Sequence, residues 1–173
     1  MQINDLIAQF VNSGSHERKK GRYFSSELYN LLKGKLKPKD FFKERKIDEQ
    51  GVKNISTGVA SEDYLTKVFE GTKTKCKPQD KKEIKITDEI VVVAKPDYVF
   101  DDFVLEVKCP VRELNSIPPW YATQCEAYYR AFKKDVFLGV IVHPFSVKTF
   151  KYTPNDELWE DIKIAIKKFH EKL

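Results

Sequence analysis

Residues 90–110 read IVVVAKPDYVFDDFVLEVKCP, with two runs of β-branched and aromatic residues on either side of the acidic pair at 101–102. Runs of this kind around a short polar pair predict a β-hairpin. Centring the turn on that pair predicts three cross-strand pairs, which are Phe100 with Phe103, Val99 with Val104, and Asp97 with Glu106. The last of these pairs places two carboxylates opposite each other.

Side chains along a strand alternate between two faces, so the hairpin has two distinct sides. One side is expected to be a core face and carries Phe100, Phe103, Tyr98, Leu105, Val107, Ala94 and Cys109. The other side carries Val99, Val104, Asp97, Glu106 and Lys108. Opposed residues have Cβ atoms about 5 Å apart, and like charges at that separation destabilise a hairpin. A divalent cation such as Mg²⁺, which prefers oxygen ligands, is the simplest explanation for the two carboxylates.

The order Pro96-Asp97 and then Glu106-Val107-Lys108 resembles the PD…(D/E)xK signature of the restriction-endonuclease-like nucleases. The second half of this signature is weak by itself, because the Lys-rich chain has several other acidic residues two positions before a lysine. Only the copy at 106–108 pairs with an upstream Pro-Asp across a tight turn in an apolar setting. The alternative is a solvated hairpin face whose charged residues have no catalytic role.

Two flanking patterns extend the resemblance. Gly58-x-x-x-Glu62 is similar to the first motif of RecB-like and lambda-exonuclease-like enzymes, and Gln124-x-x-x-Tyr128 is similar to their QxxxY motif. Asp63 competes with Glu62 for the acidic position, and Glu62 could instead pair with a lysine at the edge of an apolar stripe. Gln124 and Tyr128 could also be a core tyrosine with a glutamine at its rim. The chain therefore resembles the RecB-like and lambda-exonuclease-like group of the PD-(D/E)xK nuclease superfamily between residues 58 and 128.

This resemblance implies a nuclease that hydrolyses DNA with Mg²⁺ or Mn²⁺. Asp97, Glu106 and the backbone carbonyl of Val107 would hold the cation, as in the family. Glu62 would contact it directly, through water, or by helping a second ion to bind. Lys108 would orient the attacking water or neutralise charge in the transition state, and Gln124 and Tyr128 would complete the catalytic set by positioning the nucleic-acid strand.

The positions of the cysteines and histidines limit which cofactors are expected. CRISPR-associated members of the RecB-like group hold an iron–sulfur cluster with four cysteines, three of them after the nuclease core. This chain has Cys76, Cys109 and Cys125 and none after Cys125, so no cluster is expected. The odd count without a CxxC spacing implies no disulfide framework. The three histidines are scattered, which gives little support to a zinc site.

Positive charge is concentrated near the N-terminus. Residues 16–46 contain 11 Lys and Arg against 4 Asp and Glu, whereas the remainder has 20 against 22. Basic residues neutralise phosphates and aromatic rings stack on bases, so this segment is predicted to contact DNA. The residues chosen for that contact are Arg18, Lys19, Lys20, Arg22 and Tyr23, together with Gln124 and Tyr128. The alternative is that the aromatics pack inward and the lysines form a solvated face.

The length of 173 residues and a hydrophobic content of 41% predict one folded α/β domain, with a restriction-endonuclease-like core and a mixed central β-sheet flanked by helices. Its expected parts are a basic helical region over 1–50, a catalytic core over 55–152 and a helix over 155–173. Helices are predicted over 3–10, from Ser25 or Ser26 to Leu32, from Pro38 to Lys46, over 58–70 capped by Ser56 or Thr57, from Pro119, and after Asn155 or Asp156. Strands are predicted at 83–87, 136–142 and 147–152, besides the hairpin.

No apolar run is long enough to span a bilayer and no signal-peptide layout is present, so the expectation is a soluble protein of the cytoplasm, including that of a virus-infected host cell. DNA repair, recombination and replication of a virus or mobile element all use such enzymes. One alternative is a nucleic-acid-binding protein that keeps the fold without catalysis, and another is an interaction module that uses its aromatic surface. Exo- or endonuclease action, polarity, strandedness of the substrate, the number of metal ions and homo-oligomer formation all stay open.

Overall fold

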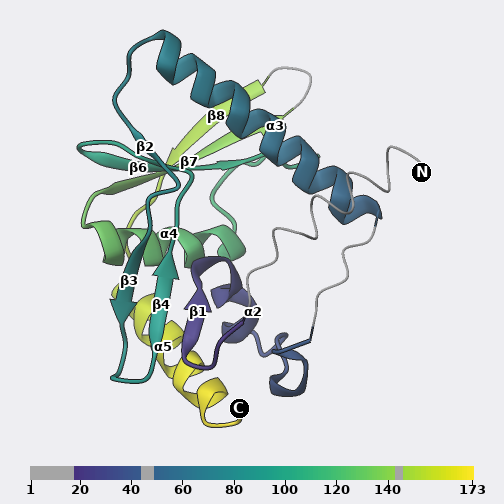
Figure 1. Cartoon of the computed structure of the whole chain (residues 1–173), viewed down its shortest axis with the longest axis vertical. Helices are drawn as coiled ribbons and strands as arrows, with labels where there is room; N and C mark the ends of the chain where they lie inside the picture. The colour runs from purple at the N-terminus through teal and green to yellow at the C-terminus, as the bar shows by residue number, and fades with distance from the viewer. Residues whose placement is uncertain (1–17, 44–48, 143–145) are drawn as a thin grey trace.

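The computed structural model of the chain describes residues 18–43, 49–142 and 146–173. It is a mixed α/β fold in which helices flank a central mixed sheet, as predicted (Figure 1). The elements are β1 (Arg22–Phe24), η1 (Ser25–Glu27), α2 (Leu28–Leu32), η2 (Pro38–Asp40), α3 (Glu49–Gly71), β2 (Lys77–Pro78), β3 (Lys82–Lys85), β4 (Val91–Ala94), β5 (Tyr98–Val99), β6 (Phe103–Lys108), α4 (Pro119–Phe132), β7 (Asp135–Val142), β8 (Ser146–Lys151) and α5 (Asp156–His170).

The strands form two hydrogen-bonded sheets, which we call the larger and the smaller ladder. The larger has the order β2-β5-β6-β7-β8, and the smaller has the order β1-β4-β3. Strands β6 and β7 run parallel, so the chain crosses between them through α4, whereas β5 with β6 and β7 with β8 are antiparallel. This β6-α4-β7 unit places the end of β6 beside the start of α4, and the candidate site lies there.

The hairpin register is confirmed in part. Tyr98 pairs with Leu105 and Val99 pairs with Val104, as the turn at 101–102 requires. The prediction of one continuous strand from Ile90 to Phe100 is wrong, because β4 ends at Ala94 and belongs to the smaller ladder. Pro96 lacks the backbone N–H that an uninterrupted ladder needs, so the chain leaves one ladder there and enters the other.

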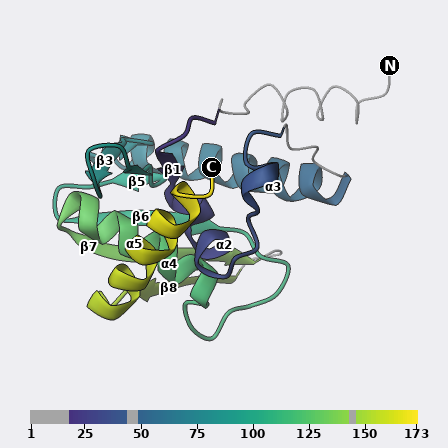
Figure 2. The ribbon, with the colours of Figure 1, turned by 90° about the horizontal axis from the view of Figure 1, so that it is seen from below.

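The central strands β5, β6 and β7 of the larger ladder have buried residues on both faces, whereas the edge strands β2 and β8 are partly exposed. Figures 1 and 2 show α3 on one side and α4 on the other. On the α3 side the core consists of Tyr98, Phe100 and Val107, packed against Leu65, Phe69, Cys76, Phe103, Leu105 and Ile141. On the α4 side it consists of Ala94, Val99, Val104, Cys125, Tyr128, Phe132, Val136 and Tyr152. The prediction of a single core face is therefore wrong, since α4 covers the carboxylate side, and Ala94 joins that side because the strand breaks after it.

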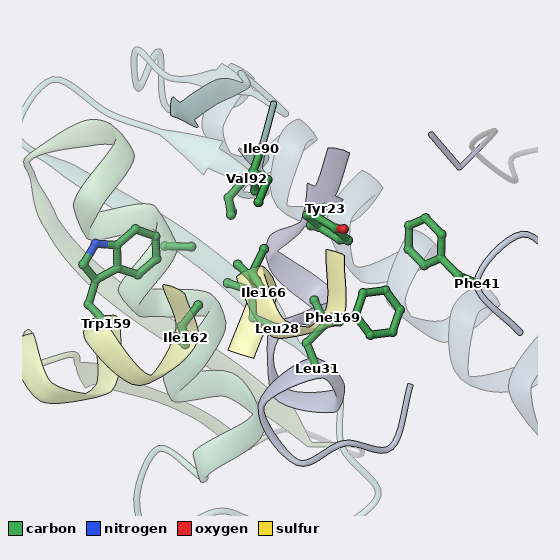
Figure 3. Packing of buried hydrophobic residues seen from close by; sticks show 11 residues of the cluster. Tyr23, Leu28, Leu31, Phe41, Ile90, Val92, Trp159, Ile162, Ile166 and Phe169 are labelled. Carbon is green, nitrogen blue, oxygen red and sulfur yellow. The ribbon is translucent and has the colours of Figure 1, made fainter. Parts of the chain in front are cut away.

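A third core cluster joins the smaller ladder to α2 and α5 (Figure 3). It contains Tyr23, Leu28, Leu31, Phe41, Ile90, Val92, Ala127, Trp159, Ile162, Ile166 and Phe169. Strand β1 contributes Tyr23 to this core and pairs in parallel with β4. The expectation that residues 1–50 form a helical region is therefore wrong for residues 22–24, which are part of the central structure.

Two helix starts differ from the predicted ones. Helix α3 begins at Glu49, nine residues before the predicted start. The segment from Ser25 begins with the 3-10 turn η1, whose N-cap is Phe24, and neither serine caps it. Only the 3-10 turn η2 follows Pro38 among the described residues, and the predictions for 3–10 and 44–46 lie outside them.

Helices α4 and α5 match their predicted starts. Helix α4 begins at Pro119, and Asn155 accepts a hydrogen bond from the backbone N–H of Leu158 to cap α5. Strands β3, β7 and β8 lie within a residue or two of their predicted bounds, although the connection near Pro144 is outside the described residues. Each helix in the described part of the chain is too short or too polar to cross a membrane.

Candidate active site

Asp97 sits where the chain passes from β4 to β5. Its Oδ2 accepts a hydrogen bond of 2.7 Å from the backbone N–H of Val107 on β6, which fixes the carboxylate against the hairpin. Burial raises the pKa of Asp97, and repulsion from Glu106 raises it further, to about 8. The two carboxylates predicted to oppose each other are therefore close enough to interact electrostatically.

Glu106 is buried in the middle of β6, with 2% of its surface exposed. Its Oε1 accepts hydrogen bonds from the ammonium group of Lys108 and, at 2.9 Å, from Nε2 of Gln124. Its Oε2 is buried and has no hydrogen-bond partner among the described residues. Leaving such an atom without a partner costs roughly 1–3 kcal/mol or more for a charged group, so this oxygen is a candidate ligand for something that the protein itself does not supply.

Lys108 lies two residues after Glu106, on the same face of β6. Burial alone would lower the pKa of Lys108, but attraction by Glu106 and Asp97 outweighs it and holds the pKa above its ordinary value. The ammonium group also lies 5.7 Å from the centre of the Tyr121 ring on α4. Lys108 is therefore a fixed positive charge beside the two carboxylates.

Gln124 and Tyr128 face Glu106 from α4, one helical turn apart. Besides its bond to Glu106, Nε2 of Gln124 lies 2.7 Å from the hydroxyl of Tyr128, and that hydroxyl donates to the backbone oxygen of Lys95 at 3.3 Å. Burial, followed by repulsion from Glu106, raises the pKa of Tyr128 well above its ordinary value. The neutral hydroxyl thus ties α4 to the strand break just before Asp97.

Glu62 reaches the site from α3, on the opposite face of the ladder from α4. Burial raises the pKa of Glu62, with Glu106 contributing a smaller repulsion. Its Oε2 accepts a 3.2 Å hydrogen bond from Nε2 of Gln79, and its backbone oxygen accepts one of 2.6 Å from the Tyr98 hydroxyl. Asp63, the competing candidate, is exposed, so the structure favours Glu62 as the acidic residue nearest the site.

Gln79 is a residue of the site that the sequence did not point out. Its backbone N–H donates to the backbone oxygen of Asp97 at 2.8 Å while its side chain holds Glu62. It adopts a left-handed conformation with φ of 50°, which is uncommon for a residue other than glycine. It lies in a stretch that looks like a polar loop, and nothing in its local sequence marks it.

The arrangement fits a divalent cation in part. Asp97 and Glu106 supply two carboxylates, one of them with a buried oxygen that has no partner in residues 18–43, 49–142 and 146–173. The N–H of Val107 points toward Asp97, and in an extended strand the carbonyl of the same residue projects to the same edge. Among the described residues, no three His, Cys, Asp or Glu side chains gather as a metal-binding group, so Glu62 is not assembled with the pair as a third side-chain ligand.

The residues predicted to contact nucleic acid differ in their burial and in their partners. Tyr23 is fully buried, and its hydroxyl lies 3.0 Å from Nδ1 of His170, so the prediction that it stacks on bases is wrong. Arg18 bonds Glu27 at 2.5 Å and the backbone oxygen of Phe41, and Arg22 bonds Glu83 at 2.6 Å. Lys19 and Lys20 are exposed, and their contact with DNA stays a prediction.

The fold has counterparts among solved structures, although no family model and no curated protein matches the sequence. It is similar to SSO0001, with a TM-score of 0.75 and 14% identity over 99% of this chain and 87% of that one. It is also similar to the alkaline exonuclease LHK-Exo from Laribacter hongkongensis, with a TM-score of 0.64 and 11% identity over 88% of each chain.

A phage-related exonuclease from Haemophilus somnus 129PT is a further structure of this kind, with a TM-score of 0.52 and 13% identity over 94% of this chain and 97% of that one. LHK-Exo has also been solved in complex with dAMP, and that structure aligns with a TM-score of 0.61. At these identities the likeness shows the fold alone, which this chain shares with structures described as exonucleases.

Proposed function

We propose that this protein is a deoxyribonuclease of the PD-(D/E)xK type that depends on Mg²⁺ or Mn²⁺. The observation that carries the proposal is the buried Oε2 of Glu106, which has no partner among the described residues and lies in a cluster with Asp97 and Lys108. The exonuclease fold of the structural neighbours supports the same reaction class. An acidic pair beside a fixed ammonium group matches what phosphodiester hydrolysis requires.

Asp97, Glu106 and the carbonyl of Val107 would hold the cation. When bound, Mg²⁺ or Mn²⁺ supplies a Lewis acid that polarises the scissile phosphate and lowers the pKa of water. Lys108 keeps its proton and stabilises negative charge that develops on the phosphate. Gln124 holds one oxygen of Glu106, so the other oxygen is aimed in a fixed direction. Glu62 adds a half-buried carboxylate on the α3 side of the site.

The deciding experiment is a cleavage assay with Mg²⁺ or Mn²⁺ on circular and end-labelled linear DNA, both single- and double-stranded. The test variant is Glu106→Gln, because glutamine keeps an oxygen for Gln124 and Lys108 and replaces Oε2 with an amide group that cannot bind a cation. The matched control is Asp102→Asn, which removes an exposed carboxylate from the turn of the same hairpin. We expect the wild type and the control to cleave, and Glu106→Gln to lose at least 100-fold in rate, the order of an electrostatic catalytic group.

Cleavage of circular substrates would identify an endonuclease, and cleavage confined to linear substrates would identify an exonuclease. Equal cleavage by wild type and Glu106→Gln would refute the assignment of the site. Retention of DNA in a gel shift without any product would support the alternative of a binding protein that keeps the nuclease fold.

A further inference from the structure

A row of aromatic rings leads away from Lys108 along the surface. The ring of Tyr121 lies 5.7 Å from the Lys108 ammonium group, and the ring of Trp120 lies 5.9 Å from that of Tyr121. Tyr29 on α2 follows at 6.3 Å from Trp120, and the ammonium group of Lys35 lies 5.1 Å from the Tyr29 ring. Three rings therefore connect a cation in the candidate site with a second, exposed cation outside it.

Trp120 is the exposed member of the row. It has 48% of its surface accessible, whereas Trp159, the other tryptophan, has 8% and lies in the core. Tryptophan carries a large apolar surface and is highly buried on average, so a half-exposed indole next to a catalytic site is unexpected from packing alone. The rings on either side of it, Tyr29 and Tyr121, are partly buried and support it.

The backbone holds this indole in place. Trp120 is the second residue of α4, and it directly follows Pro118 and Pro119, which fix the entry of the helix. Its carbonyl accepts a 3.2 Å hydrogen bond from the Thr123 hydroxyl, and α2 packs on α4 through a shared core. The ring is thus presented by rigid elements rather than by a loop, so little conformational entropy is lost when a flat ligand binds.

The chemistry of the row fits an unpaired nucleic-acid strand. Aromatic faces stack on bases of any sequence, and lysines neutralise the phosphates between them. In a duplex both faces of each internal base are already stacked on neighbours, so an indole can receive only bases that are unpaired or terminal. The row has a lysine at each end, and one of these lysines is Lys108. This arrangement is expected for a strand whose bases stack on the rings and whose phosphates contact the lysines as it enters the site.

We propose that Trp120, supported by Tyr29 and Tyr121, is a base-stacking subsite that receives unpaired nucleotides next to the cleaved phosphate, and that the substrate is single-stranded DNA or a single-stranded DNA end. This inference rests on the proposed nuclease function and adds the strandedness of its substrate. Lys35 binds a phosphate at the outer end of the row.

Binding is measured with the catalytic variant Glu106→Gln in EDTA, using oligo(dT), an abasic strand of equal length and a blunt duplex. Because Trp159 is buried, stacking on Trp120 should quench the protein's tryptophan fluorescence with oligo(dT) and not with the abasic strand. Replacing Trp120 with alanine in this background should weaken oligo(dT) binding by roughly 5- to 150-fold, the range for one base on one ring. Trp120→Phe should abolish the quench while keeping most of the affinity.

The abasic strand separates stacking from a structural role. Trp120→Ala should leave abasic-strand affinity unchanged, whereas an equal loss for both strands, or an equal or tighter binding of blunt duplex, would overturn the proposal. Val111→Ala is the control, since it removes an exposed apolar side chain from the loop before α4. Lys35→Ala should reduce the salt dependence of binding by about one phosphate contact.

Failure of the inference and failure of the proposed function are distinguishable. If the wild type cleaves DNA but Trp120→Ala has no selective effect on base-bearing strands, the subsite is refuted and the nuclease assignment stands. If the wild type neither cleaves nor binds any DNA, both are refuted.

Discussion

Asp97→Asn should make this protein more stable at alkaline pH when divalent cations are removed. Burial and then repulsion by Glu106 raise the pKa of Asp97 from 3.8 to about 8. A carboxyl whose pKa is higher in the folded state than in the unfolded state takes up its proton on folding. Its contribution to stability is therefore complete below about pH 4 and is lost progressively as the pH rises through 8.

The size of the effect follows from the shift. About four pH units at 1.36 kcal/mol per unit give an upper value of roughly 5 kcal/mol. Asparagine resembles the protonated acid, because it does not titrate and can still accept the 2.7 Å hydrogen bond from the Val107 N–H. The variant should therefore already exceed the wild type by roughly 1.6 kcal/mol at pH 5, about 1.2 units above the ordinary pKa of 3.8, and should exceed it by a few kcal/mol at pH 9.

The measurement is urea unfolding in EDTA at pH 5, 7 and 9. Wild-type stability should fall across this range, with Glu62 adding to the slope because burial raises its pKa as well. Asp102→Asn, in the exposed turn, should follow the wild-type curve. A wild-type stability that stays flat or rises from pH 5 to 8, or an Asp97→Asn variant that is weaker at pH 9, would show that the two carboxylates do not repel each other as described.

Three further outcomes are expected. Titration of Mg²⁺ or Mn²⁺ at pH 7 should release about one proton per ion, because Asp97 is protonated below pH 8, and calorimetry in two buffers of different ionisation enthalpy measures this release. Tyr128→Phe removes the hydroxyl that bonds the backbone oxygen of Lys95, and should lower the free energy of unfolding by about 1 kcal/mol in urea titrations. Gly21→Ala should be strongly destabilising in thermal unfolding, because its φ is +81° and an added Cβ would lie 2.1 Å from the backbone oxygen of Glu89. Gly34→Ala is its control, since φ is +62° there but no atom lies within 4 Å, so only the backbone strain of about 1 kcal/mol remains.

The sequence predicted the parts of the site that depend on local order. Asp97, Glu106 and Lys108 meet because a short hairpin fixes their register, and a hairpin register follows from turn length and alternation. Gln124 and Tyr128 follow from helical spacing, since residues four apart share a helix face. Pro118 and Pro119 correctly indicated the start of α4.

The errors arose where distant segments pair. Strand β1 was hidden among basic residues, and only its pairing with β4, about seventy residues away, shows that Tyr23 is a core residue. The alternation of residues 90–100 cannot reveal that β4 and β5 belong to different ladders, because both are apolar on their buried sides. Gln79 acts through its backbone conformation and through contacts with two separate elements, and neither has a local pattern.

Two buried glutamates of this molecule differ in how completely their oxygens are hydrogen-bonded. Glu126 is fully buried and receives bonds from Arg130 at 2.7 Å, the Tyr152 hydroxyl at 2.5 Å and the Asn155 N–H at 2.9 Å, so both of its oxygens are satisfied. Glu106 is almost as buried, yet within the described part of the chain only one of its oxygens has partners. The same fold that pairs one carboxylate completely leaves the other incomplete beside Asp97, whose pKa is raised. The cation site that we propose would explain this difference, because the free energy of ligand binding can offset what the carboxylates cost the fold.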